Sequence, residues 1–136
     1  MDDMLQTELD FSMAVDLGKL MNDHRGVDVL VMDMRALNFW TDFFVIATVT
    51  SNTHLSGLER HIKDFAIEKD LEIKRRSRRP VSNGEQQLDE WCIIDLGNIV
   101  IHLMSSPSRS FFEIERLWSA APIIYNAGSG KNSDSK

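Results

Sequence analysis

The chain has 136 residues and a mass of 15.6 kDa, the size of one domain, so a second full domain is excluded. Asp and Glu outnumber Lys and Arg by 21 to 15. The resulting formal charge of −6 excludes a basic protein that binds the phosphate backbone of nucleic acids over most of its surface. The single cysteine excludes an internal disulfide and a cysteine-built zinc site, and no apolar run is long enough to span a bilayer.

The first half of the chain predicts the order helix, strand, strand, helix. Apolar residues at steps of three and four indicate a helix over about 10–23, with Asp10 as its N-cap. Residues 27–34 and 43–49 have the length and composition of strands, and the unbroken apolar run of 43–49 is typical of a strand covered on both faces. Capping side chains at 50–52 then introduce a second helix that ends near Asp70.

The middle of the second half predicts a hairpin. Residues 71–74 have the composition of a short strand, and residues 75–84 that of a turn-rich surface segment. Gly97 and Asn98 accept a positive φ and separate two apolar runs, 91–96 and 99–104. This pattern predicts a tight antiparallel hairpin.

The carboxyl-terminal part predicts a helix and a polar tail. Ser106 as cap and Pro107 in the first turn begin a helix that stops before Pro122. Residues 126–136 contain almost no apolar side chain, so we expect disorder there and a single domain over 1–125. The whole pattern predicts the α/β (or α+β) class, with a mixed sheet of about five strands flanked by helices.

Residues that could carry catalysis are present, but their arrangement does not favour it. Cys92 lies in an apolar strand without a nucleophile elbow, and the 7 glycines form no phosphate-binding loop. Asp28, Asp33 and Asp42 lie near strand ends and could hold magnesium for nucleotidyl transfer, yet the expected glycine-serine loop is missing. We therefore favour a binding role, which needs no cofactor or metal. The alternative is a metal-dependent nucleotidyltransferase that uses Asp33, Asp42 or Asp95.

The histidines allow two further interpretations. His54 and His61 share a helix face but stand about 10 Å apart along its axis, too far for one metal ion. His102 falls on the strand face opposite Ile99, Ile101 and Leu103, with Asp95 across the hairpin. His102 and Asp95 could form an acid/base couple or, more simply, a structural hydrogen bond or part of a binding surface.

A short basic run stands out against the acidic chain. Five positive charges fall within six positions, while the rest of the chain carries 15 − 5 = 10 basic residues against 21 acidic ones. This run could contact nucleic-acid phosphate locally, or it could be a solvated edge strand. Its members are Lys74, Arg75, Arg76, Arg78 and Arg79.

Large apolar side chains concentrate in the hairpin and the final helix. Phe111, Ile114 and Trp118 form the expected buried stripe of that helix, so we assign Trp118 to the core. Phe112 is displaced from this stripe by about 100° and is a candidate protein-binding anchor beside Glu115.

Four short sequence motifs together resemble those of the ribosomal silencing factors, also called Iojap-like proteins. The similarity covers roughly 12–121, and the combination of motifs is specific although each one alone is weak. The motifs are Thr41-Asp42-Phe43-Phe44-Val45-Ile46, Ser51-Asn52-Thr53-His54, Trp91-Cys92-Ile93-Ile94-Asp95-Leu96-Gly97-Asn98-Ile99-Val100-Ile101-His102 and Phe111-Phe112-Glu113-Ile114-Glu115-Arg116-Leu117-Trp118.

The resemblance implies a repressor of translation rather than an enzyme. Such a factor binds the large ribosomal subunit at its fourteenth protein and sterically blocks the small subunit, in starvation or during ribosome maturation. The resemblance also implies a fold akin to nucleotidyltransferases without their catalytic set.

The matched motifs also imply a surface that faces the partner. At its rim, Asp95 and Arg109 would offer charges to the partner, and the same apolar patch would allow free copies to pair. Because the amino-terminal ten residues lack the basic start of a targeting peptide, we expect a cytoplasmic location and no membrane partner. The implied surface residues are Trp91, Leu96, His102, Met104, Phe112 and Glu115.

Overall fold

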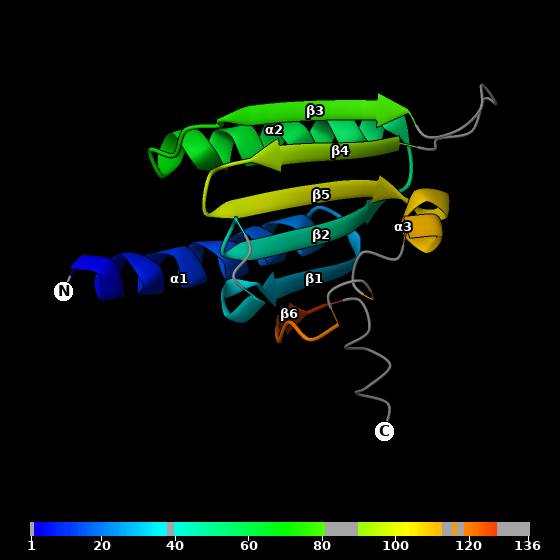
Figure 1. Cartoon of the computed structure of the whole chain (residues 1–136). Helices are drawn as coiled ribbons and strands as arrows, with labels where there is room; N and C mark the ends of the chain where they lie inside the picture. Colours follow the sequence, from blue (N-terminus) through cyan, green and yellow to red (C-terminus); the bar gives the residue numbers. More distant parts are fainter. Residues whose placement is uncertain (1, 38–39, 81–89, 113–115, 117–118, 128–136) are drawn as a thin grey trace.

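A computed structural model describes residues 2–37, 40–80, 90–112, 116 and 119–127 (Figure 1). Two strands lie between two helices in the first half of the chain, and the second half adds an edge strand, a hairpin, a short helix and a last strand. In chain order they are α1 (Asp2–Asp23), β1 (Val27–Asp33), the 3-10 turn η1 (Arg35–Leu37), β2 (Phe43–Val49), α2 (Asn52–Glu68), β3 (Arg75–Pro80), β4 (Glu90–Asp95), β5 (Ile99–Ser105), α3 (Ser106–Phe112) and β6 (Ile123–Asn126).

The strands form one mixed sheet in the order β3-β4-β5-β2-β1-β6. The central pair, β2 and β5, is parallel, with Ile46 opposite His102, and the neighbours of that pair are antiparallel. The predicted class is therefore confirmed. The sheet has six strands rather than about five, because β6 adds to the edge of β1 with Tyr125 opposite Val31.

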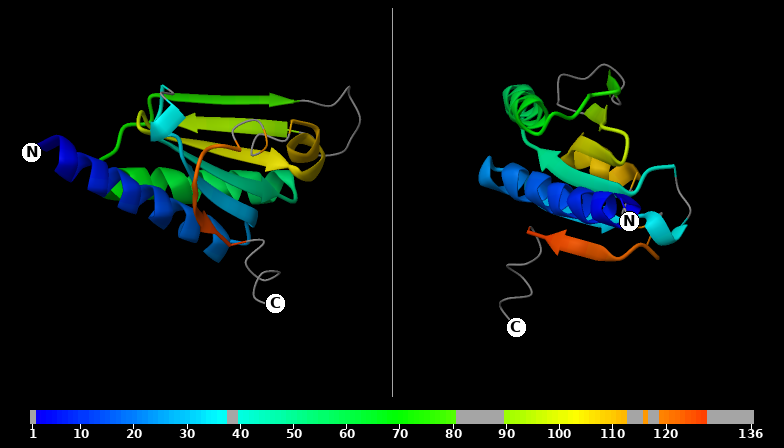
Figure 2. Two further views of the ribbon diagram at one scale, coloured as in Figure 1. Left: turned by 60° about the horizontal axis from the view of Figure 1, so that its bottom comes forward. Right: turned by 90° about the vertical axis from the view of Figure 1, so that its left-hand side faces the viewer.

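Helices α1 and α2 cover the same face of this sheet, which we term the helix face (Figure 2). The helix face holds a large apolar core that includes Leu17 of α1, Ile62 of α2 and Ile101 of β5. A second, smaller apolar cluster, with Phe44 and Met104 among its members, occupies the opposite face. All seven residues of β2 are buried, as predicted for a strand covered on both faces.

The first helix begins earlier than the sequence predicts. α1 starts at Asp2, so Asp10 lies inside the helix and the prediction of an N-cap there is wrong. Asp10 is buried and accepts a hydrogen bond from Nδ2 of Asn98 at 2.8 Å. The helix continues upstream because residues 4–9 are mostly good helix formers, whose propensity outweighs a possible cap at Asp10.

The second helix begins where the capping residues predict. Ser51 is the N-cap in extended conformation, and its Oγ accepts from the backbone N–H of His54 at 3.0 Å. The helix ends at Glu68, two residues before the predicted end, and buries Leu55, Leu58, Ile62 and Ala66.

The basic run forms an edge strand, so two local predictions are wrong. Residues 71–74 form no strand, and the predicted turn-rich segment begins with β3, which pairs antiparallel with β4. None of the residues of β3 is of the β-branched or aromatic kind that favours strands, so the pairing with β4 decides its conformation. The position of β3 at the sheet edge agrees with the edge-strand interpretation of the basic run.

The predicted β4–β5 hairpin is confirmed. Gly97 has φ +99°, and the turn closes with Leu96 N–H donating to the carbonyl of Ile99 at 2.9 Å. The carboxylate of Asp95 accepts from the backbone N–H of Gly97 at 2.8 Å, which further fixes the turn.

Candidate functional site

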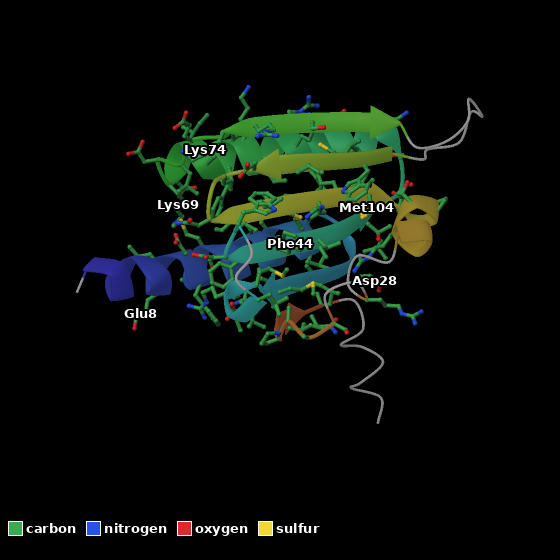
Figure 3. All side chains as sticks on the ribbon, in the orientation of Figure 1. Glu8, Asp28, Phe44, Lys69, Lys74 and Met104 are labelled. Atoms are coloured by element: carbon green, nitrogen blue, oxygen red, sulfur yellow. The ribbon has the colours of Figure 1, made fainter. Side chains whose placement is uncertain are left out.

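The hairpin brings three of the predicted surface residues together. Trp91 pairs with Met104, and Ile93 pairs with His102, so Trp91, His102 and Met104 lie side by side on the face opposite the helices. Figure 3 shows Met104 of β5 and Phe44 of β2 on this face. Trp91 is partly exposed, whereas His102 is 5% exposed and Met104 is completely buried. Trp91 is therefore the member of this group that a partner can touch directly.

Of the other predicted residues, only the side chain of Leu96 is described by the structure. Leu96, at the hairpin turn, is 8% exposed and belongs to the core on the helix face. Phe112 is the last residue of α3, which follows β5 directly, but its side chain is outside the described part of the chain. Glu115 and Trp118, together with the tail from residue 128, are also outside the described residues, while Asn126 ends β6.

The Trp91 indole is bound to the His102 imidazole. Trp91 Nε1–H donates to His102 Nδ1 at 3.1 Å, and the edge of Phe44 packs against the imidazole with 4.5 Å between ring centroids. Because Nδ1 accepts, the ring proton is assigned to Nε2, which has no hydrogen-bond partner within the described residues. Burial lowers the pKa of His102 to about 3, so the imidazole is neutral at physiological pH.

This geometry decides between the interpretations of His102. Asp95 pairs with Val100 in the sheet, and its carboxylate is used by the turn. The acid/base couple of His102 and Asp95 is therefore wrong. His102 makes a structural hydrogen bond, and its partner is Trp91.

Asp33 and Asp42 interact electrostatically at one end of β1 and the adjoining loop, whereas Asp28 does not join them. The carboxylate of Asp33 is bound by Arg35, with 2.6 Å between Oδ2 and Nη2, and this hydrogen bond lowers the pKa of Asp33. Burial raises the pKa of Asp42, with a further contribution from Asp10. Asp28 lies near the other end of β1 (Figure 3). No group of three acidic, histidine or cysteine side chains in the described ranges could hold a metal ion, so the arrangement gives the nucleotidyltransferase alternative no support.

The basic run is only partly available to a partner. Arg76 Nε donates to Oε2 of Glu59 on α2 at 2.5 Å, and the thiol of buried Cys92 donates to the same oxygen at 3.2 Å. Lys74 and Arg75 are exposed, whereas the side chains of Arg78 and Arg79 are outside the described part of the chain. Within the basic run, the accessible positive charge that the structure describes is therefore at Lys74 and Arg75, and Lys74 Nζ also lies 3.7 Å from Oε1 of Glu72.

Arg109 does not face a partner, contrary to the sequence prediction. Its side chain is 7% exposed, and Nη1 donates to Thr48 Oγ1 at 3.0 Å and to the carbonyl of Val27 at 3.3 Å. The arginine ties α3 to the ends of β1 and β2. The short helix places this residue toward the sheet, which the helical spacing alone did not indicate.

One pocket was missed by the sequence reasoning. It lies between the α1–β1 turn and α2 and has a volume of about 230 Å³. Its lining includes three histidines, of which two were recognised as sharing a helix face and the third is supplied by the turn after α1. The lining residues are Asp23, His24, Arg25, His54, Gly57, Leu58 and His61.

Within the described residues, no helix is long and apolar enough to cross a membrane.

The sequence and the fold are similar to those of known proteins. Ribosomal silencing factor RsfS of Bacillus subtilis is 31% identical over 104 residues, which cover 75% of this chain and 80% of the relative. A mouse protein named Mitochondrial assembly of ribosomal large subunit protein 1 is 29% identical over 117 residues. A crystal structure of a protein from Bacillus halodurans superposes with a TM-score of 0.62 at 28% identity, covering 88% of this chain and 98% of that one.

The chain spans 48% of the mouse relative and 44% of Protein Iojap, chloroplastic, from Arabidopsis thaliana, so these relatives are longer than the shared domain. The family model described as Ribosomal silencing factor during starvation matches residues 8–136, nearly the whole chain. This protein therefore belongs to the ribosomal silencing factor family.

Proposed function

We propose that this protein represses translation by binding the large ribosomal subunit at its fourteenth protein and blocking the small subunit. Membership of a ribosomal silencing factor family supports a regulatory role at the ribosome. The name of the mouse relative refers to the large subunit, which supports that subunit as the partner. A domain of this length has a radius of gyration of about 14 Å, large enough to obstruct a contact between two subunits.

The structural observation that carries the proposal is the partly exposed Trp91, held in one orientation above an apolar cluster. Tryptophan is enriched among the few residues that dominate protein interfaces, particularly where neighbours fix its ring and exclude water. His102 and Met104 would support the indole from below, and Leu96 would fix the adjoining turn. Phe112 and Glu115 would complete the surface from the segment after β5.

Co-sedimentation with purified ribosomal subunits tests the partner. The wild-type protein should pellet with the large subunit, and Trp91→Ala should lose about 30-fold in affinity if the indole is a main anchor. Ile67→Ala removes an exposed aliphatic side chain of α2 and is the matched control, which should bind normally. Retention by the small subunit alone, or undiminished binding of Trp91→Ala, would contradict the proposal.

Subunit joining tests the mechanism separately from the binding. When both subunits are mixed under joining conditions, the wild-type protein should keep them apart on a sucrose gradient. Trp91→Ala should permit joining at the same concentration. Joined ribosomes that still carry the wild-type protein would show that the bound factor does not obstruct the small subunit.

The basic run is proposed to touch ribosomal RNA at its exposed start. The double variant Lys74→Gln and Arg75→Gln should reduce the salt dependence of subunit binding. Each lost phosphate contact should lower the slope of log affinity against log salt concentration by about one. Lys63→Gln, an exposed charge on α2, is the control. An unchanged slope in the double variant would remove the RNA contact from the proposal.

We further propose that the free protein resides in the cytoplasm and that two free copies pair through the surface around Trp91. An apolar patch that awaits a partner can associate with its own copy at high concentration. Analytical ultracentrifugation should then show a concentration-dependent dimer that Trp91→Ala weakens. A wild-type protein that remains monomeric at high concentration would exclude the pairing.

A further inference from the structure

The pocket between the α1–β1 turn and α2 has a chemistry that the ribosomal role does not use. The His24 ring stacks on the His61 ring with 3.6 Å between centroids and 18° between planes. Arg25 adds a guanidinium, and Asp23 adds the carboxylate of the lining. The two imidazoles come from elements that are distant in the sequence, so the fold itself creates the pair.

This arrangement does not suit a metal ion. A metal bound to one imidazole lies near the plane of that ring at about 2 Å from the nitrogen. Two nearly parallel rings 3.6 Å apart cannot both direct a nitrogen at one ion in this way. His54 cannot replace either ring, because its Nδ1 accepts from Thr50 N–H at 3.0 Å and its Nε2 lies 3.0 Å from the carbonyl of His24.

The hydrogen-bonding inventory of the pocket favours an anion. A guanidinium has five N–H donors and no acceptor, and each imidazole has one donor when neutral and two when protonated. Arg25, His24 and His61 supply these donors, whereas the charged acceptor in the lining is the carboxylate of Asp23. A ligand that supplies several acceptor oxygens would satisfy the surplus of donors.

The volume restricts the size of that ligand. Pockets for drug-sized ligands have about 300 to 1,000 Å³, and this pocket has about 230 Å³. A single phosphoryl group fits this space, whereas a whole nucleotide would extend beyond it. We propose that this pocket binds a phosphoryl anion, either free or at the end of a larger molecule, with Arg25, His24 and His61 as its ligands.

The stacked rings make this binding dependent on pH. Burial lowers the pKa of His61, and the adjacent His24 and Arg60 lower it further, while Asp64 opposes them. A negative charge nearby therefore favours protonation of the His61 ring. Asp23 is the acidic group of the lining, and a bound anion would supply the additional charge. Binding is accordingly coupled to proton uptake and strengthens as the pH falls.

A titration followed by histidine resonances in NMR tests the site without ribosomes. Sulfate is the first probe, because its charge is constant between pH 6 and 8, and chloride at equal ionic strength is the reference. The wild-type protein should give saturable shifts at His24 and His61, with an affinity at least tenfold higher at pH 6 than at pH 8. Inorganic phosphate and a 5′-phosphorylated trinucleotide then distinguish a free anion from the end of an RNA chain.

Variants locate the site. Arg25→Gln should weaken sulfate binding at least tenfold, and His61→Asn should remove most of the pH dependence, while the exposed Lys63→Gln should behave as wild type. Linear shifts without saturation, or equal binding by Arg25→Gln and the wild type, would overturn the proposal. Because no ribosomal particle is present, this result is independent of whether the protein silences ribosomes.

Discussion

Acid should destabilise this domain through the buried ring of His102. A histidine in the unfolded chain takes up a proton near pH 6.5, whereas His102 in the folded protein remains neutral down to about pH 3. Between these two values the unfolded state binds more protons, so the free energy of unfolding falls as the pH falls below 6.5. Above pH 6.5 the contribution of the neutral ring is complete.

The expected loss is a large part of the total stability. Each pH unit within this window changes the free energy of unfolding by about 1.4 kcal/mol, so at pH 4.5 the loss from His102 alone is about 3 kcal/mol. Domains of this kind have a total stability of about 5 to 15 kcal/mol. Urea denaturation at pH 7.0 and pH 4.5 measures the difference.

Two variants separate this titration from the other acid-sensitive groups. In His102→Asn, an amide oxygen near the position of Nδ1 can still accept from Trp91, but nothing titrates there. This variant should be less stable than the wild type at pH 7 by about 1 to 3 kcal/mol because of lost packing, and its stability should fall by about 3 kcal/mol less on acidification. Trp91→Phe keeps the imidazole and should retain the wild-type pH dependence. An equal decline in His102→Asn and the wild type would refute the reasoning.

Three further predictions concern helix stability, each checked by denaturation midpoints. Gly18→Ala should destabilise by about 1 to 3 kcal/mol despite the higher helix propensity of alanine, because the new Cβ would lie 2.6 Å from Cγ2 of Val31; a stabilised variant would show that α1 can move away from the sheet. Gly57→Ala, with no atom within 4 Å of the new Cβ, should stabilise by about 0.5 to 1 kcal/mol, and a loss of stability would contradict the open space at this site. Ser51→Ala should cost about 1 kcal/mol through the lost N-cap, and an unchanged midpoint would mean that the cap contributes nothing.

The parts of the fold that depend on local chemistry could be predicted from the sequence. The hairpin follows from Gly97 and Asn98, which are adjacent and accept the positive φ that a tight turn needs, and the start of α2 follows from the side chain of Ser51. β3 and β6 could not be predicted in the same way. β3 becomes a strand through its pairing with β4, and the short strand β6 pairs with β1, which lies far away in the sequence.

In the candidate sites too, features set by the local sequence could be predicted, and features set by contacts between distant elements could not. Alternation along β5 correctly placed His102 opposite the helix face, because a strand of regular pleat fixes the direction of each side chain. The burial of Met104 and Arg109 depends on which elements cover each face, and the stacking of His24 on His61 depends on how the α1–β1 turn meets α2. Such contacts arise only when the whole chain has folded, so no periodicity in the sequence reveals them.

The parallel pairing of β2 with β5 has a consequence for the biosynthesis of the protein. β2 is synthesised before α2, β3 and β4, yet its partner on one side arrives only with β5. A nascent chain therefore carries an apolar strand with an open edge until Ser105 has emerged, and long-range pairing of this kind is slow. Premature termination before β5 would release an aggregation-prone fragment and not a smaller stable domain, so this protein is expected to require chaperone protection during its own translation.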